Sequence, residues 1–255
     1  MQDEELANQI RTLLFEHPAY GHRRIAVALG IGKNHVRRVM KTCGIPSPKR
    51  RKHYTKANNG TKPAPVNLLK DQALVAAYPH HIWAEDFTYL WFQNRFYYLA
   101  TVIDLYSRQV VGWSLGTRHG TDLITAALMD GVSKHPSPAI LHNDRGSEYL
   151  SQRYRTICAS LEITMSASVP GSPWQNGFQE SFYNNFKAEL GNLKQLDNEG
   201  QLLEAIALQL NYYNTKRIHS SLRTNPAAYA ARFEQQKQKN ELTVVRDKVM
   251  TKAGT

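Results

Sequence analysis

The stretch from residue 82 to residue 104, IWAEDFTYLWFQNRFYYLATVID, decides the fold of this chain. Aromatic and β-branched residues dominate it, and a short polar break at residues 91–94 divides it, a pattern typical of two consecutive strands. Residues 109–115 continue the pattern after a second break. Residues 82–90, 95–104 and 109–115 therefore predict an antiparallel meander.

Helices and strands alternate after this meander. The hydrophobic pattern predicts helices over residues 122–132, 148–161, 181–190 and 201–213, with short strands at 139–141 and 163–166. This order predicts an α/β fold in which helices flank a mixed five-stranded sheet. The polar, basic tail after residue 233 is expected to be poorly ordered.

The N-terminal residues predict a small all-α domain over residues 1–45. Helices are expected at 3–16, 22–29 and 34–42, with Asn34 as an N-cap and the glycines of Gly30-Ile31-Gly32 forming a tight turn. Two short helices across such a turn make a helix-turn-helix pattern, although small helical caps that bind nothing look similar. The candidate DNA contacts of this domain are Arg23, Arg24, Lys33, Asn34, His35, Arg37, Arg38 and Lys41.

Basic charge is concentrated in one part of the chain. The net charge is +11, but residues 17–70 contain thirteen Lys or Arg and no Asp or Glu, so the rest of the chain sums to −2. Residues 46–80 read as an extended basic linker that contains several prolines, and its candidate DNA contacts are Lys49, Arg50, Arg51 and Lys52. Such a distribution is typical of nucleic-acid binding, and a solvated basic face or a membrane-surface patch is the alternative.

Several functional classes are disfavoured by the composition. No run of about 18 apolar residues is present, and the acidic N-terminus lacks the pattern of a signal peptide. The two cysteines, Cys43 and Cys158, are too few and too far apart for a disulfide framework or a structural zinc site. The chain has no phosphate-binding P-loop, so ATP use is not indicated.

Three carboxylates are the candidate catalytic and metal-binding residues. Asp86 lies in the first strand, Asp144 follows the strand at 139–141, and Glu180 comes 35 intervening residues later, near the start of a helix. Hard cations such as Mg²⁺ bind carboxylate oxygens, and two ions can hold both the attacking and the leaving oxygen of a phosphoryl displacement. Each carboxylate alone has an ordinary alternative explanation. Asp86 could be an exposed edge residue, Asp144 a turn residue before glycine, and Glu180 a favourable charge at the start of a helix dipole.

Neighbouring residues refine this candidate site. Asp104 could replace one of the ligands, but we expect it to cap a hairpin turn with Ser107. Period-2 alternation places Glu85 on the opposite sheet face from Asp86. Asn176 and Lys187 lie at i−4 and i+7 from Glu180, on one side of a helix, so both are candidate DNA contacts, with a solvated charge as the alternative for Lys187.

Taken together, the motifs resemble those of bacterial insertion-sequence transposases of the retroviral-integrase-like (DDE) superfamily, specifically the catalytic product of their second reading frame. The resemblance extends from about residue 10 to residue 229. Its matching blocks are HPAYGHRRI at 17–25, WAEDFTY at 83–89, VIDLYSR at 102–108, HNDRGSEY at 142–149 and YNTKRIHSSL at 213–222, together with Glu180, Lys187 and Glu189. One departure is Gln175-Asn176-Gly177, where many relatives carry Asp-Asn-Ala.

The resemblance implies a ribonuclease-H-like catalytic core, which we assign to residues 81–232 and which residues 233–255 follow as a basic tail. It implies that Asp86, Asp144 and Glu180 bind two Mg²⁺ ions, for which Mn²⁺ can substitute. The expected partners are double-stranded DNA, as terminal inverted repeats and target, further copies of the chain on paired ends, and the upstream-frame protein or a fusion with it. The expected location is the bacterial cytoplasm, in association with the nucleoid.

These expectations predict metal-dependent nicking at element ends followed by strand transfer from the freed 3′-hydroxyl. Two alternatives stay open at this point. A catalytically silent DNA-binding regulator would keep the basic N-terminus without nicking DNA. A non-specific nuclease of the same fold would cut DNA without recognising ends and would join nothing.

Overall fold

The computed structural model describes residues 3–47, 65–69, 75–168 and 177–253, and of residues 241–253 only the backbone. An N-terminal unit contains α1 (Asp3–Glu16), α2 (His22–Leu29) and α3 (Lys33–Thr42). The larger core contains β1 (Ile82–Phe92), β2 (Arg95–Asp104), β3 (Val110–Gly116), α4 (Thr121–Val132), β4 (Ile140–Asn143), α5 (Gln152–Ser160), β5 (Thr164–Ala167), α6 (Gly177–Glu189), the 3₁₀ turn η3 (Leu193–Gln195) and α7 (Glu199–Thr215). The final helix is α8 (Pro226–Ala253).

The sheet has five strands in the order β3-β2-β1-β4-β5. The first three strands pair antiparallel, whereas β4 pairs parallel with β1 and with β5. The predicted meander and the mixed five-stranded sheet are therefore confirmed, and β2 has the predicted bounds. Because β1 lies at the centre of the sheet, a side chain on it can be reached from several elements.

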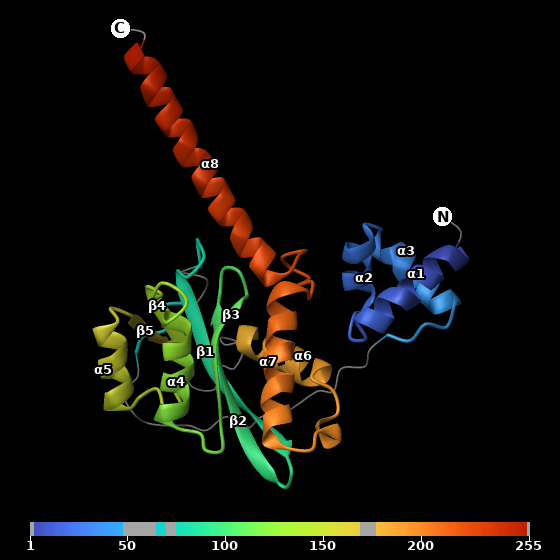
Figure 1. The fold of residues 1–255 in the computed structure, drawn as a ribbon, viewed down its shortest axis with the longest axis horizontal. Coiled ribbons are helices and arrows are strands. Elements are labelled where there is room, and N and C mark those ends of the chain that lie inside the picture. The colour runs from blue at the N-terminus through green and yellow to red at the C-terminus, as the bar shows by residue number, and fades with distance from the viewer. Residues whose placement is uncertain (1–2, 48–64, 70–74, 169–176, 254–255) are drawn as a thin grey trace.

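Helices cover both faces of the sheet (Figure 1). Period-2 alternation along β2 directs Ala100 and Val102 to the core beneath α4 and α5, and directs Leu99 and Ile103 to the core beneath α6 and α7. The helix α5 begins later than predicted because the Ser151 hydroxyl caps it by accepting a hydrogen bond from the Tyr154 N–H.

Gly112 allows α4 to approach the sheet closely. A Cβ atom at this position of β3 would lie 2.3 Å from the backbone oxygen of Ala127 and 2.6 Å from the backbone nitrogen of Gly131, both in α4. Real side chains do not tolerate such contacts, so the packing distance between α4 and β3 depends on a glycine at this point.

The N-terminal helices form a core of their own from Leu6, Ile10, Ile25, Val36 and Val39, as the helical periodicity predicts. The expected cap at the third helix is wrong. Gly32 is the N-cap of α3, and Asn34 is a solvent-exposed residue within its first turn.

Two further segments differ from expectation. The helix α8 continues beyond residue 233, where we expected poor order, and extends away from the core (Figure 1). In the linker, Leu68, Leu69 and Ala76 pack against the core cluster around Ile82.

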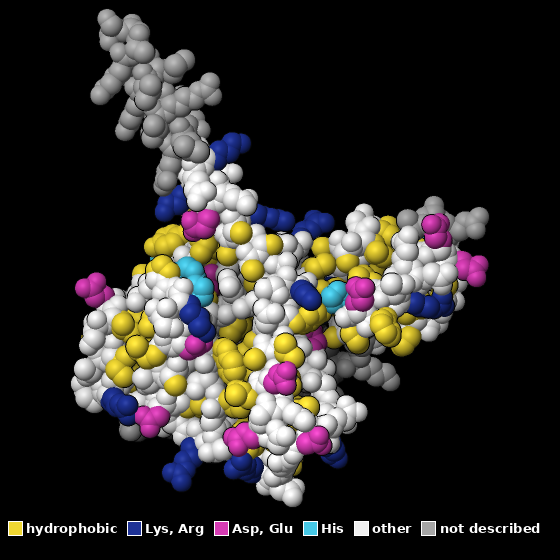
Figure 2. Space-filling model, in the orientation of Figure 1, with side chains coloured by type: hydrophobic (Ala, Val, Ile, Leu, Met, Phe, Trp, Pro, Cys, Tyr) yellow, Lys and Arg dark blue, Asp and Glu magenta, His cyan; other side chains and the backbone are white. Residues whose placement is uncertain are grey.

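Basic side chains gather around the start of α8 in the space-filling view (Figure 2). Among the described helices, none is both long and apolar enough to cross a lipid bilayer.

Candidate active site

Asp86 lies on the central strand of the sheet and is half-buried. Desolvation raises the pKa of its carboxyl well above the ordinary value, and the negative charges of Asp144 and Glu180 raise it further. The Phe87 N–H, which donates to Asp86 Oδ1 at 2.8 Å, and the ammonium of Lys187 act in the opposite direction. The three predicted carboxylates and Lys187 therefore act on one another electrostatically.

Asp144 follows β4 directly, and the strand register explains its position. Ile82 pairs with Ile140 and Ala84 with His142, so the same register extended by two residues brings Asp144 level with Asp86. Asp144 is exposed to solvent, and its Oδ1 accepts a hydrogen bond from the Gly146 N–H at 2.7 Å. Desolvation nevertheless raises the pKa of its carboxyl.

Gly146 makes room for two carboxylates. A Cβ atom at this position would lie 2.9 Å from Asp144 Oδ1 and 2.8 Å from Glu148 Oε2. Glu148 also adds to the negative potential that raises the pKa of Asp144, and it pairs with His119 at 2.9 Å. The glycine thus fixes a compact acidic turn beside the central strand.

Glu180 lies in the first turn of α6 and is exposed. The residues around it hold this helix on the sheet. The buried Gln179 donates from Nε2 to the backbone oxygen of Ala84 at 2.7 Å, and the Tyr183 hydroxyl donates to the backbone oxygen of Asp86 at 2.6 Å. Both contacts end on β1, so the helix that carries Glu180 is fastened beside Asp86.

Lys187 extends the same helix face. Its ammonium lies 4.6 Å from the centre of the Tyr89 ring, and the residue is half-buried. Burial lowers the pKa of this ammonium, while the Asp86 carboxylate opposes that shift. The lysine is thus directed toward the carboxylates.

The donor chemistry of the three carboxylates suits a hard divalent cation, which prefers oxygen ligands and would offset their mutual repulsion. In the part of the chain that the structure describes, however, no group of three Asp, Glu, His or Cys side chains is arranged so that it could already hold a metal ion.

The two carboxylates that we set aside have other roles. Asp104 accepts hydrogen bonds from the Ser107 N–H at 2.9 Å, the Ser107 hydroxyl at 2.5 Å and the His80 N–H at 3.0 Å, so it stabilises the turn after β2. Glu85 is fully buried on the opposite sheet face and accepts a hydrogen bond from Tyr154 of α5.

The exposed polar face predicted on α3 is present. Lys33, Asn34, Arg37, Arg38 and Lys41 are exposed, and His35 is half-buried. Arg38 makes a bidentate ion pair with Asp3, at 2.6 and 2.8 Å, so it must exchange that partner to bind a phosphate. Arg23, on α2, is also exposed.

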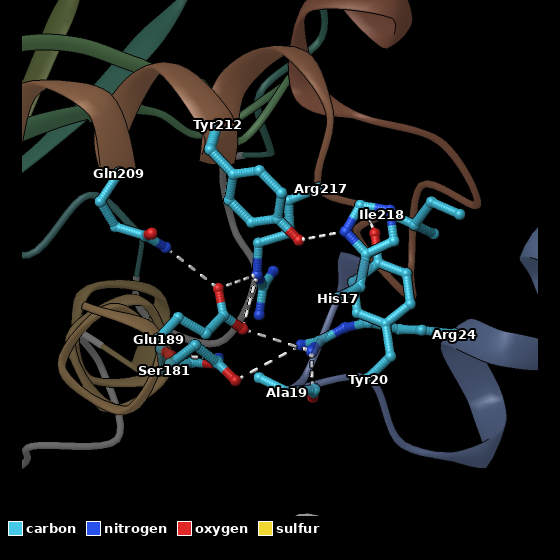
Figure 3. A network of polar contacts seen from close by, with 11 residues as sticks. His17, Ala19, Tyr20, Arg24, Ser181, Glu189, Gln209, Tyr212, Arg217 and Ile218 are labelled. Carbon is cyan, nitrogen blue, oxygen red and sulfur yellow. Dashed lines mark hydrogen bonds and ion pairs between the residues drawn. The ribbon is translucent and has the colours of Figure 1, made fainter. Parts of the chain in front are cut away.

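Arg24 differs from its neighbours because it is buried. Its guanidinium reaches Oδ1 of Asn185 at 3.3 Å and Glu189 at 3.5 Å, both on α6 (Figure 3). Arg217 reaches the same Glu189 carboxylate from the other side, with Nε at 2.6 and 2.9 Å from its two oxygens. We therefore withdraw Arg24 from the DNA contacts, since it joins the N-terminal unit to the core.

Two further contacts support this junction. The Tyr212 hydroxyl lies 2.7 Å from His17 Nδ1, and the Ile218 N–H donates to the Tyr20 hydroxyl at 2.7 Å (Figure 3). The predicted contacts Lys49, Arg50, Arg51, Lys52 and Asn176 lie outside the described residues.

The sequence prediction missed the residues that position the site. Gln179 and Tyr183 are four residues apart, so they share the face of α6 that meets β1, and this spacing was the available signal. Glu148 was missed because its approach to Asp144 depends on the path of the turn at Gly146.

Comparison with known proteins gives concordant matches. A family model described as an integrase core domain matches residues 76–173, and a second model with that description matches residues 161–226. The transposase for insertion sequence element IS904 of Lactococcus lactis subsp. lactis (strain IL1403) is 34% identical over 87% of this chain and 91% of its own. The putative transposase InsK for IS150 of Escherichia coli (strain K12) is 30% identical over 80% of this chain and 74% of its own.

Solved structures share the fold. The catalytic core of HTLV-2 integrase, solved in complex with magnesium in a trimeric form, has a TM-score of 0.52 at 21% identity and covers 61% of this chain and 99% of its own. The simian T-cell lymphotropic virus intasome in complex with the PP2A regulatory subunit B56 gamma has a TM-score of 0.55 at 18% identity, over 87% of this chain and 74% of its own. At these identities the likeness concerns the fold alone.

Proposed function

The chain belongs to the insertion-sequence transposases that carry an integrase core domain, and from this membership we propose that it nicks the ends of a mobile DNA element and transfers the freed strands to target DNA. As a member of the family it is a DNA transposase, an enzyme of the polynucleotidyl transferase class. The observation that carries the finer proposal is the common electrostatic environment of Asp86, Asp144 and Glu180 beside the central strand.

In this proposal Asp86, Asp144 and Glu180 hold divalent cations, with two Mg²⁺ ions as the expected occupancy and Mn²⁺ as a substitute. When bound, such ions supply Lewis-acid stabilisation to the attacking and the leaving oxygen of an in-line displacement at phosphorus. Nicking uses water as the oxygen nucleophile, and strand transfer uses the freed 3′-hydroxyl of the DNA. Neither step therefore forms a covalent bond between protein and DNA.

The remaining residues of the site position the substrate and the ligands. Lys187 binds a DNA phosphate beside the carboxylates, and Asn176 is proposed as a further DNA contact. Tyr183 and Gln179 keep Glu180 beside Asp86 by tying α6 to the backbone of β1.

The N-terminal unit would recognise the terminal inverted repeats. The exposed side chains of α3 and Arg23 are suited to phosphate and base contacts, because a recognition helix reads base edges in the major groove. Lys49, Arg50, Arg51 and Lys52 would add phosphate contacts along the linker. Self-association on paired ends, assistance by an upstream-frame protein and association with the nucleoid complete the proposal.

Incubation of purified protein with labelled end DNA tests this function. The parent should release a 3′-hydroxyl end and join it to a target duplex in Mg²⁺ or Mn²⁺, and scrambled-end DNA should be cut far less. D144N and E180Q should lose at least 100-fold of both activities while binding end DNA normally. Cutting without end preference or joining would indicate a general nuclease, and binding without cutting would indicate a regulator.

A further inference from the structure

A cavity of about 390 Å³ lies between α6, the turn after β2 and the segment that follows α7. Its wall is formed by the turn after β2, by the first two turns of α6 and by the segment that follows α7. The residues that carry its chemistry are Arg108, Phe178, Ser181, Asn185, Arg217 and His219. Apart from the aromatic ring of Phe178, these side chains are hydrogen-bond donors or can act as donors.

Arg108 contributes a guanidinium with an unused donor to this cavity, and the Asp104 carboxylate is a counter-charge that acts on its pKa against the effect of burial. Its Cζ atom stacks 3.8 Å above the Phe178 ring, which holds the planar group in place. Its Nη1 is buried, and it has no hydrogen-bond partner among the described residues. Burial lowers the pKa of Arg108, and such a group is normally satisfied by an anion.

Arg217 contributes a second guanidinium that is only partly satisfied. The residue is 2% exposed, and its Nε is committed to Glu189. Its Nη2 is buried and likewise unpartnered within the described part of the chain. A single carboxylate, Glu189, already serves both Arg24 and Arg217, so it leaves positive charge in excess here.

The pKa of His219 is lowered in part by this positive charge. Burial, followed by the charges of Arg217, Arg108 and Arg24, lowers the pKa of its imidazole to about 4. The imidazole is therefore neutral at physiological pH, and its Nδ1 lies 2.9 Å from the hydroxyl of Ser221 at the cavity rim. A neutral imidazole and a hydroxyl can both serve as hydrogen-bond donors to an oxygen ligand.

The cavity lies at the N-terminal end of α6, the helix that also carries Glu180. Gly177 and Phe178 form its wall at the N-terminal end of α6, where the helix dipole favours an anion. Ser181, which follows Glu180 in the same helix, also lines it. The lining residues Phe178, Ser181 and Asn185 recur at helical spacing, so the cavity opens on a different side of α6 from the face of Gln179 and Tyr183, which meets β1.

We propose that this cavity binds a backbone phosphate of the DNA, across α6 from the carboxylates, with Arg108 and Arg217 as the anchoring cations. The proposal rests on the proposed function, which supplies the DNA. Forked guanidinium donors match the oxygens of phosphate and carboxylate groups, and DNA supplies phosphates; the described lining contains no carboxylate that could hold a cation instead.

The test uses Arg108→Met, which removes the charge but keeps the aliphatic length, and Ser221→Asp, which places a negative charge at the rim. Ser220→Asp is the matched control, because Ser220 is exposed and adjacent but does not line the cavity.

Affinity for end DNA is measured over ~50–200 mM salt without divalent metal. R108M and S221D should each weaken binding about tenfold, and R108M should reduce the salt slope by about one. S220D should stay within about twofold of the parent.

A second measurement separates this proposal from the proposed function. Inorganic phosphate, compared with chloride at equal ionic strength, should raise the Tm of the parent and of S220D but have little effect on R108M and S221D. If R108M and S221D match the parent and S220D in both measurements, the phosphate pocket is disproved, even when the parent cuts end DNA. If phosphate raises the Tm of the parent and S220D but not of R108M and S221D, while the parent neither binds nor cuts end DNA, the phosphate pocket is supported and the proposed function is contradicted.

Discussion

The hydroxyl of Tyr183 donates a hydrogen bond to the backbone oxygen of Asp86, at 2.6 Å, and so joins α6 to the central strand. The same hydroxyl lies 2.9 Å from Thr101 Oγ1 on β2. Glu180 lies three residues before Tyr183, so a contact that is not itself catalytic sets the separation between two of the three carboxylates. Removing this hydroxyl should disturb catalysis without exposing the core.

Tyr183→Phe should lower the rate of end cleavage about 10- to 100-fold, because positional errors of about 1 Å at a reacting centre can cost that much. The concentration of Mg²⁺ needed for half-maximal rate should rise in parallel, which a purely structural role of Tyr183 would not require. Tyr98→Phe, on the sheet face under α4, is the control and should behave like the parent. Equal rates and equal Mg²⁺ requirements for Y183F and Y98F would contradict the positioning role.

Gly146→Ala should abolish most of the activity while changing the Tm little. The added methyl group would sit within 3 Å of oxygen atoms of both Asp144 and Glu148, so one carboxylate must turn away from the site. Cleavage of end DNA should fall at least 100-fold, with circular dichroism as the check on folding. Gly21→Ala is the matched control because a Cβ there meets nothing within 4 Å, and full activity in both variants would show that the turn tolerates the shift.

The sequence predicts the sheet well because alternation in β1 and β2 is a local property that survives folding. It also places Asp86 within a strand, Asp144 after a strand and Glu180 at a helix start, as the structure has them, while their joint role as metal ligands stays a prediction. It does not predict the burial of Arg24, since this depends on the N-terminal unit docking against α6, 165 residues away. The Asn34 cap was wrong because Gly32 already adopts the extended cap conformation.

Gly112→Ala should destabilise the core by about 2–4 kcal/mol, because overpacking against backbone cannot be relieved by a rotamer change. The methyl group would meet the Ala127 oxygen at 2.3 Å and push α4 off the sheet. Urea unfolding followed by tryptophan fluorescence measures the effect, since Trp83 lies in the same core cluster. Gly32→Ala, where a Cβ meets open space, should cost less than ~1 kcal/mol, and similar costs for the two variants would refute this account.

Glu189→Gln should destabilise the protein and loosen the N-terminal unit. It leaves Arg24 and Arg217 buried without their shared counter-charge, which typically costs about 3–5 kcal/mol. Limited proteolysis between residues 43 and 80 should then proceed faster than in the parent. Glu199→Gln, which breaks an exposed pair with Arg95, should cost under ~1 kcal/mol, and an equally small effect of E189Q would show that the junction does not depend on this carboxylate.

His142 should make the fold sensitive to mild acid. The imidazole is 1% exposed, its two nitrogens lie 2.9 and 3.0 Å from the hydroxyls of Ser166 and Ser168, and burial lowers its pKa to about 4. Below pH ~6.5 the His142 imidazole is therefore protonated in the unfolded chain but stays neutral in the folded chain. Stability contributed by the neutral imidazole should be lost as the pH falls from ~6.5 to 4, by up to about 3 kcal/mol.

His142→Gln removes this linkage, so its stability should fall less steeply than that of the parent between pH 6.5 and 4.5, even though it starts lower at pH 7. The raised pKa values of Glu85 and Asp86 act in the opposite direction, since the folded chain there binds protons more tightly than the unfolded chain. Those contributions are common to both proteins, so they cancel in the difference between the two urea-unfolding curves. Parallel pH profiles for the parent and H142Q would mean that His142 is not the group that resists protonation in the folded chain.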